Sequence, residues 1–305
     1  MKSPITKFSG LSLLSIVFTC LISARSEAGQ PLPWQIWMQS AASPNMEAIE
    51  RFNILTLYII IPIILLVMGL LAYVMIKFRA SSNPEPSQIT HNTIIEILWT
   101  LGPVVLLVFL AIPSFQLLSS QFHPSKEPTV TIKATGYQWY WGFEYQDDPE
   151  ISFETRLIGR DEGSPDSADK IIKEREEYGK NDLKKYPRLL AVDKEIVVPV
   201  GEVVRLLVTS GDVIHSFALP AFGLKMDGIP GRINETFFQA TKEGLYYGQC
   251  SELCGRDHAF MPLAIRVVSF DKFEMWKKRA SHNIDAANKL LVLKKSTRII
   301  EVAAN

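Results

Sequence analysis

The fold of this chain is decided by the stretch Cys250-Ser251-Glu252-Leu253-Cys254-Gly255-Arg256-Asp257-His258-Ala259-Phe260-Met261. It offers two thiols, one imidazole and one thioether in the spacing C-x3-C-x3-H-x2-M, and all four groups are ligands for soft or borderline transition metals. A loop this short can direct them to one point. His215 is a fifth candidate, because the apolar, strand-like run around it would hold its ring rigidly. The sequence therefore predicts a metal site that the rest of the chain positions.

Three chemistries compete for the two cysteines of this stretch. A disulfide would suit an exported protein, but it would close a very short loop and leave the two histidines and the methionine without a role. Structural zinc takes Cys and His but not usually Met. Imidazole, thiolate and thioether together form the ligand set of copper electron-transfer sites. Copper fits best, and a second cysteine allows two copper ions to be bridged through sulfur, although the spacing does not require it.

The composition of the 305 residues limits the possible functions. Basic and acidic residues number 32 each, and 47% of the residues are hydrophobic. Such a chain can bury a substantial core, and its balanced charge gives no indication of nucleic-acid binding. The sequence contains no C-x-x-C-H motif, so we expect no attached c-type haem.

Residues 1–28 have the pattern of a secretory signal peptide. A basic start is followed by an apolar run and by the small-residue end Ser26-Glu27-Ala28, so we expect cleavage after Ala28. Cys20, the third cysteine, would be removed with this segment. The alternative, lipid modification of Cys20, is disfavoured because the residues before it are not small. An export signal places the mature N-terminus outside the cytoplasm.

Two long apolar runs follow a lead-in at residues 29–52, which we expect to be exposed because its prolines oppose a long helix. The runs cover about residues 53–76 and 94–118, and each is long enough to cross a bilayer as a helix. Two basic residues in the connection, Lys77 and Arg79, favour a cytoplasmic loop. The sequence therefore predicts a transmembrane hairpin over residues 53–120, with everything after it outside the cytoplasm.

The pattern changes after the hairpin to short β-rich runs separated by Gly and Pro turns. This predicts an all-β sandwich or Greek-key barrel over residues 121–280. Residues 157–186 are rich in charge and poor in apolar side chains, so we interpret them as a surface insertion with a helical portion rather than as part of the core. The domain ends with an amphipathic helix that carries Phe273 and Trp276, and residues 281–305 form a tail without a clear signal.

Several motifs, in order, resemble those of cytochrome c oxidase subunit II from the bacterial aa3-type haem–copper oxidase family. Leu245-Tyr246-Tyr247-Gly248-Gln249 and the cysteine stretch after it resemble the family's dicopper loop. Ala134-Thr135-Gly136-Tyr137-Gln138-Trp139-Tyr140-Trp141 resembles its aromatic segment, Asp212–Phe217 its upstream histidine motif and Leu224–Arg232 its central turn. The resemblance covers nearly the whole mature chain. It implies a two-helix transmembrane hairpin followed by a cupredoxin-like Greek-key β-barrel.

The resemblance also implies a ligand set for a dinuclear copper A centre. The side chain of Glu252 would reach a magnesium ion shared with subunit I, since a carboxylate suits hard Mg²⁺; the alternative is a solvated loop acid. The implied copper ligands are His215, Cys250, Cys254, His258 and Met261, with the backbone carbonyl of Glu252.

Other residues receive roles from the same resemblance. Trp139 would be the ring through which an electron arrives from cytochrome c, with core packing as the alternative, and Tyr137 stands where many relatives carry His. Glu96 would lie at the entrance of a proton channel of the catalytic subunit, although an acid at a helix N-terminus also has a structural use. A negative docking face would speed association with a basic cytochrome c. The alternative is that its acids only keep the surface soluble. The predicted members of this face are Glu144, Asp147, Asp148, Glu150, Glu154 and Asp193.

The function implied is that of cytochrome c oxidase subunit II. It would accept electrons from cytochrome c and pass them to haem in subunit I, where oxygen is reduced to water and protons are pumped. The expected partners are subunit I, subunit III, cytochrome c and lipid of the bacterial inner membrane, with the copper domain on the periplasmic side. Quinol oxidase subunit II lacks the copper ligands, a copper-delivery module would not need Trp139, and nitrous oxide reductase carries a large propeller that is absent here.

Overall fold

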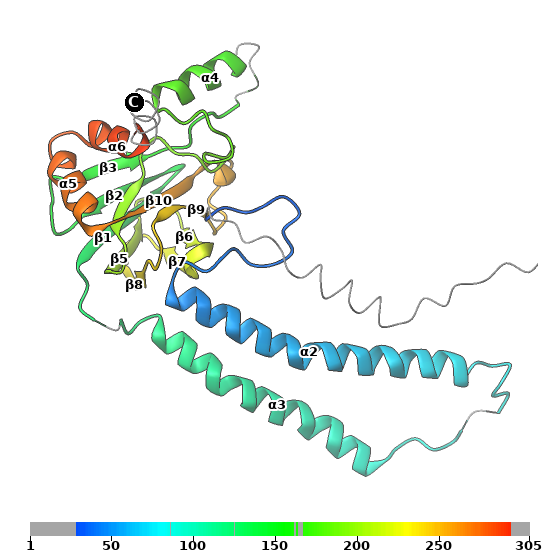
Figure 1. Cartoon of the computed structure of the whole chain (residues 1–305). Coiled ribbons are helices and arrows are strands. Elements are labelled where there is room, and N and C mark those ends of the chain that lie inside the picture. The colour runs from blue at the N-terminus through cyan, green and yellow to red at the C-terminus, as the bar shows by residue number, and fades with distance from the viewer. Residues whose placement is uncertain (1–28, 86, 125, 162, 164–166, 294–305) are drawn as a thin grey trace, which may run out of the picture.

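The computed structural model describes residues 29–293 apart from 86, 125, 162 and 164–166, and consists of a helical hairpin and a β-sandwich domain (Figure 1). The predicted signal peptide and the end of the tail lie outside the described residues. The two hairpin helices, α2 (Pro44–Lys77) and α3 (Thr93–Ser120), run side by side. Both are long and apolar enough to cross a membrane, and their most apolar windows are exposed on the outside of the chain, as lipid contact requires.

The lead-in, residues 29–52, packs in part against the β-domain. This corrects the prediction of an exposed segment, which was based on its prolines. Gly29 forms a β-bridge to Tyr246. Ser43 is fully buried; its hydroxyl accepts a hydrogen bond from the Met46 N–H and donates one to the carbonyl of Phe222 (2.7 Å). Pro44 occupies the first turn of α2, where a missing N–H costs nothing. The lead-in therefore starts the first helix and attaches it to the β-domain.

Two five-stranded sheets face each other to form the domain, with strand orders β3-β2-β1-β5-β8 and β4-β10-β9-β6-β7. The pairs β1–β5 and β4–β10 are parallel and the others antiparallel. Alternate residues of β2 (Trp141, Phe143, Tyr145) point into the core. This confirms the cupredoxin-like all-β prediction. The strand bounds are β1 Val130–Tyr137, β2 Tyr140–Tyr145, β3 Ser152–Thr155, β4 Ile196–Pro199, β5 Val203–Ser210, β6 His215–Leu219, β7 Leu224–Gly228, β8 Asn234–Gln239, β9 Gly244–Cys250 and β10 Pro262–Val268.

Strand pairing brings the predicted metal ligands to one end of the sandwich. The first residues of β6 pair with the last residues of β9, so that Phe217 lies opposite Cys250. The loop before β6 and the loop after β9 therefore meet. The tight turn between β1 and β2, which contains Trp139, lies at the same end, because Gly136 on β1 contacts His215.

The segment after β3 is only partly a surface insertion, so the prediction for residues 157–186 needs correction. Its helix α4 (Ser167–Glu177) is polar, as expected. The chain on either side of α4, however, forms a second buried cluster on the sheet that contains β9 and β10. Within residues 157–186 the cluster includes Ile158 and Tyr186, and such isolated apolar residues among charged ones escaped the compositional argument. The cluster consists of Ile158, Tyr186, Leu190, Ala191, Val192, Leu245, Tyr247 and Ala264.

Two helices close the domain after β10. In α5 (Phe270–Ala280) Phe273 and Trp276 are buried against the core, as the amphipathic pattern predicted. A further helix, α6 (Ile284–Leu293), lies in the tail, where the sequence pattern predicts no element. The indole N–H of Trp276 donates to Asn288 of α6 (2.8 Å), which joins the two helices.

Candidate metal centre

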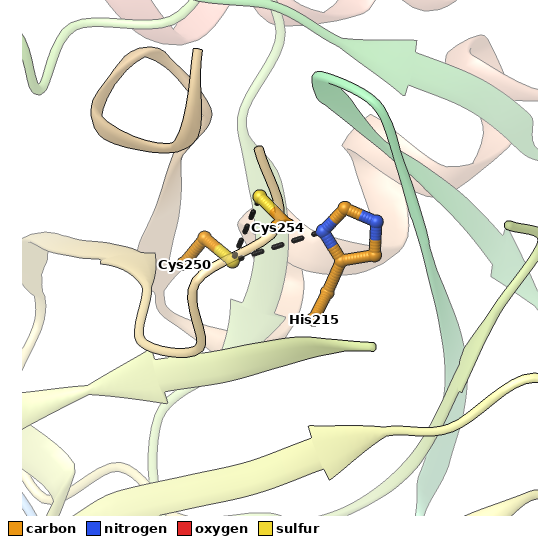
Figure 2. A group of neighbouring side chains, drawn as sticks. All are labelled: His215, Cys250 and Cys254. Atoms are coloured by element: carbon orange, nitrogen blue, oxygen red, sulfur yellow. Dashed lines mark hydrogen bonds between the residues drawn. The ribbon is translucent and has the colours of Figure 1, made fainter. Parts of the chain in front are cut away.

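Five predicted side chains converge at the end of the sandwich. The ligand atoms of His215, Cys250 and Cys254 all lie within 4.8 Å of one another (Figure 2). Nδ1 of His215 is 3.8 Å from Sγ of Cys250, and the two sulfurs are 3.9 Å apart with both cysteines free. On the other side, Sγ of Cys254 is 3.5 Å from Nδ1 of His258 and 3.5 Å from Sδ of Met261. The cysteines thus form the middle of the cluster.

His215 is fixed by its immediate surroundings. It is fully buried at the start of β6, and its Nε2 lies 2.8 Å from Oδ1 of Asp212. A carboxylate there keeps the proton on Nε2 and leaves Nδ1 facing the thiols. Gly136 makes room for the ring, because a Cβ at that position would lie 2.7 Å from it. Asp212 and Gly136 were part of the quoted motifs, but their roles emerge only from these contacts.

The two thiols differ in acidity. Burial raises the pKa of Cys250, but hydrogen bonds with His215 and the Glu252 backbone outweigh it and bring the pKa down to about 7. Burial and the neighbouring charge of Cys250 raise the pKa of Cys254 to about 12. In the site without metal Cys250 is therefore the thiol that ionises first, and a bound cation favours loss of the second proton.

The backbone of the loop and the aromatic turn complete the site. The Cys250 thiol donates to the carbonyl of Glu252 (3.4 Å), so this carbonyl faces the cluster while the Glu252 side chain is exposed. Trp139 is partly exposed and lies against the loop, and the side-chain amide of Gln138 donates to the carbonyl of Cys254 (2.8 Å). Gln138 was not predicted as a site residue, although it joins the turn directly to the ligand loop.

The arrangement fits copper. Two buried thiols lie close enough for metal ions to bind between them, and imidazole nitrogens and a thioether stand on either side. Soft and borderline donors of this kind select copper over hard ions such as Mg²⁺, which prefer oxygen. The orientation of His215 by Asp212 is the support that metal-binding histidines usually have.

The predicted docking acids lie at different distances from Trp139. Glu144 pairs with Lys133 (3.0 Å), and Asp147 accepts from the Thr131 N–H (2.6 Å). Asp147 and Asp148 follow the far end of β2 from Trp139, roughly 20 Å away at about 3.3 Å per residue. Glu150 is exposed in the same turn. Glu154 lies opposite Gly142 and pairs with Arg156, whose guanidinium lies 3.9 Å from the ring centre of Tyr140. Asp193 pairs with Lys194 and accepts from the Arg156 N–H.

Glu96 lies in the first turn of α3, where it has a structural contact. Its Oε1 accepts from the backbone N–H of Asn92 (3.1 Å), and Oδ1 of Asn92 accepts from the Ile95 N–H (3.3 Å). Such reciprocal bonds satisfy N–H groups at a helix start. The side chain of Glu96 therefore caps this helix at the loop between the two apolar spans.

Two family models match the chain. The model described as cytochrome c oxidase subunit II, periplasmic domain, matches residues 130–268, and the one described as the transmembrane domain of the same subunit matches residues 31–117. Together they include both helices and the whole ligand cluster.

Individual proteins give the same result. A probable cytochrome c oxidase subunit 2 of Rickettsia felis is 45% identical over 92% of this chain and 82% of its own length. Cytochrome c oxidase subunit 2 of Oenothera berteroana is 40% identical over 86% of this chain and 96% of its own length. A crystal structure of the periplasmic domain of the oxidase subunit II of Bradyrhizobium japonicum matches 53% of this chain and 99% of that domain, with 47% identity and a TM-score of 0.43.

Proposed function

Because the chain belongs to the cytochrome c oxidase subunit II family, we propose that its five converging side chains hold a dinuclear copper centre fed by cytochrome c. The family's role is electron transfer to subunit I of a haem–copper oxidase. The observation that carries the proposal is the placement of His215 Nδ1 and the sulfurs of Cys250 and Cys254 within 4.8 Å of one another. His258, Met261 and the Glu252 carbonyl supply the remaining contacts.

The residues of the chain perform three tasks in this function. When bound, the copper pair supplies reversible one-electron chemistry. Strands β6 and β9 hold His215 and Cys250 in fixed positions, so the ligands move little between oxidation states. The buried thiols are kept from bulk water. Trp139, whose turn is hydrogen-bonded to the ligand loop through Gln138, is the proposed point at which the electron arrives.

The partners follow from the family and from the distribution of charge. The chain is a membrane protein and assembles with other oxidase subunits; we propose subunit I, subunit III, cytochrome c and the lipid of a bacterial inner membrane. Lys77 and Arg79 between the helices support a cytoplasmic loop and a periplasmic copper domain. The exposed Glu252 carboxylate is the proposed magnesium ligand at subunit I, and Glu96 the proposed residue at the proton channel.

The acids of the proposed docking face are spread over the domain rather than grouped around Trp139. Glu144, Asp147 and Asp148 lie along β2 and beyond its far end from Trp139, so they would act through long-range attraction of a basic cytochrome c rather than through contact around the tryptophan. Asp193 accepts from the N–H of Arg156, whose guanidinium lies over the ring of Tyr140 beside Trp139. Two of them also have structural hydrogen bonds, which limits their freedom to pair with a partner.

The test is metal analysis with electron paramagnetic resonance on the full chain, purified in detergent without its partner subunits and loaded with copper. We expect about two copper ions per chain and a hyperfine pattern of one electron shared by two nuclei, since two sulfurs can bridge two ions. The Cys254→Ser chain is the matched comparison and should lose the shared pattern. One copper with a mononuclear spectrum, or preference for zinc, would contradict the proposal.

A further inference from the structure

We propose that residues 157–193, here called the supporting segment, position the His258 half of the ligand loop, and that Arg160 is the residue through which they act. The inference rests on the proposed copper centre. It gives a task to the charged segment, which the family role does not explain, and assigns Arg160 as a positioning residue.

Arg160 holds the ligand loop on both sides of His258. Its Nη1 and Nη2 lie 3.3 and 3.1 Å from the two carboxylate oxygens of Asp257, and its guanidinium lies 4.6 Å from the ring centre of Phe260. Paired hydrogen bonds between a guanidinium and a carboxylate fix direction as well as distance. The Asp257 side chain is only 8% exposed, so its direction is set by the guanidinium groups that bind it.

Arg256 cannot replace this contact. It also pairs with Asp257, at 3.1 Å, but its side chain is 80% exposed and belongs to the same loop. Its guanidinium also lies 5.5 Å from the ring centre of Trp139 in the turn between β1 and β2, which is a contact with another loop and not with a strand or with α4. Within the described chain, residues 255–260 make no other side-chain hydrogen bond to a distant segment than the one with Arg160.

The backbone next to Arg160 is held by helix α4. The N–H of Gly159 donates to Oε2 of Glu174 (2.7 Å), and Gly159 has a φ of +70°. A Cβ at that position would lie 2.7 Å from Nε of Arg175. Arg175 is itself buried and donates to the carbonyls of Lys180 and Tyr186, both at 3.0 Å. Arg160 therefore extends from a fixed base.

That base is joined to the core sheet by a buried ion network. Lys180 lies 3.0 Å from Glu195, just before β4, and Glu195 also pairs with Arg266 of β10. All three side chains are at most 10% exposed. Hydrogen bonds and ion pairs therefore continue from the sheet through α4 and Arg160 to the loop that carries His258.

His258 needs support of this kind. Its Nδ1 faces Cys254, but in the described part of the chain its Nε2 has no hydrogen-bond partner, in contrast to His215 with Asp212. Its ring is therefore placed through the backbone of its neighbours. Fixing Asp257 and Phe260 fixes that backbone.

The experiment compares Arg160→Gln, Arg160→Lys and the control Arg205→Gln in the full chain loaded with copper. Arg205 pairs with Glu235 across β5 and β8, so its replacement removes the same charge from an ion pair away from the loop. We expect Arg160→Gln to lose copper to a chelator about tenfold faster and to change the hyperfine splitting. Arg160→Lys should keep part of the effect, and the control should match the natural chain. An unchanged spectrum and rate in Arg160→Gln would overturn the proposal.

Two further measurements separate this inference from the copper proposal. In the metal-free chain, amide hydrogen exchange of residues 255–260 should be faster in Arg160→Gln than in the control, whatever metal the site prefers. The effects of Asp257→Asn and Arg160→Gln should then be less than additive, because both remove the pair between Arg160 and Asp257. Unchanged exchange, or fully additive effects, would show that Arg160 does not act through Asp257. If exchange responds but copper does not bind in pairs, the copper proposal alone fails.

Discussion

The two histidines of the metal centre are held in different ways. His215 is fully buried at the start of a strand and is bonded to Asp212, three residues earlier. His258 lies in the one-turn helix η2 (His258–Phe260), is partly exposed, and depends on contacts of its neighbours with Arg160, about a hundred residues away in the chain. A ligand on a strand needs only local support, whereas a ligand on a loop needs a second segment to hold it.

Removing the atom that joins the two halves should have the largest effect. Cys254 is within 3.9 Å of Cys250 and within 3.5 Å of both His258 and Met261. We expect Cys254→Ser to abolish the shared-electron spectrum, because a hydroxyl is a poor ligand for soft copper. Paramagnetic resonance of the full chain measures this. A retained dinuclear spectrum would remove Cys254 from the site.

Breaking the base of the supporting segment should come next. Glu195→Gln would leave the buried charges of Lys180 and Arg266 without their partner and destabilise the domain by about 3 kcal/mol. Thermal unfolding followed by tryptophan fluorescence measures the loss. We also expect the His258 side of the centre to loosen before the His215 side, seen as faster amide exchange in residues 255–260 than in β6. Equal exchange on both sides would contradict the comparison.

Glu195 should also make the stability of the domain depend on pH. Burial opposes ionisation of Glu195, but Arg266 and Lys180 outweigh it, and the pKa falls to about 2 from 4.5. A lowered pKa in the folded state stabilises the fold above pH 4.5, and this contribution is lost as the pH falls toward 2. The Glu195→Gln chain should lack that part of the acid-induced loss of stability.

Weakening the direct support of His215 should reduce copper retention without unfolding the domain. Asp212→Asn replaces the carboxylate that orients the imidazole, and such changes lower metal affinity about 10- to 100-fold. Chelator competition measures the loss. Asp257→Asn is the matched change on the other side and should cost less, because it acts on His258 only through the backbone. The reverse order would show that the loop, not the strand, limits retention.

Changing the ring of Trp139 should alter the rate of reduction alone. Trp139→Phe keeps an aromatic ring but loses size, so we expect several-fold slower reduction by cytochrome c in the assembled oxidase, with the copper spectrum intact. Stopped-flow absorbance follows this step. Loss of the copper signal would instead make Trp139 a structural residue of the turn.

The smallest effect should come from the distant acids. Asp148→Asn removes one negative charge roughly 20 Å along β2 from Trp139, and we expect about a twofold rise in the KM for cytochrome c at low salt that disappears at high salt. Steady-state oxidation at two ionic strengths measures it. An effect that persists in high salt would indicate direct contact rather than long-range attraction.

The ligands themselves could be predicted because they lie close together in sequence. Cys250, Cys254, His258 and Met261 share a dozen residues, so a single loop can bring them together. His215 was placed by its apolar strand and by family resemblance. The hairpin was equally accessible, since an apolar run of membrane length has few other uses.

The supports of the ligands could not be predicted. Arg160 and Asp257 are ordinary charged residues in charged surroundings, and their pairing depends on how α4 packs. The burial of the chain beside α4 was missed because its apolar side chains are too scattered to form a periodic pattern. The lead-in differs from the expectation because a proline opposes the interior of a helix but not its first turn, where Pro44 lies and where the helix starts.

The attachment of α2 to the β-domain through Ser43 also determines where the metal centre stands. The helix runs without interruption for 34 residues, about 51 Å at 1.5 Å per residue, whereas the hydrocarbon core of a bilayer is about 30 Å thick. Its first turns therefore extend beyond the hydrocarbon core and separate the domain from the lipid. Each residue added to or deleted from these turns of α2 would move the metal centre by about 1.5 Å along the helix axis and rotate it by about 100°. The length of this helix thus sets the distance that an electron must cross between the metal centre and the membrane.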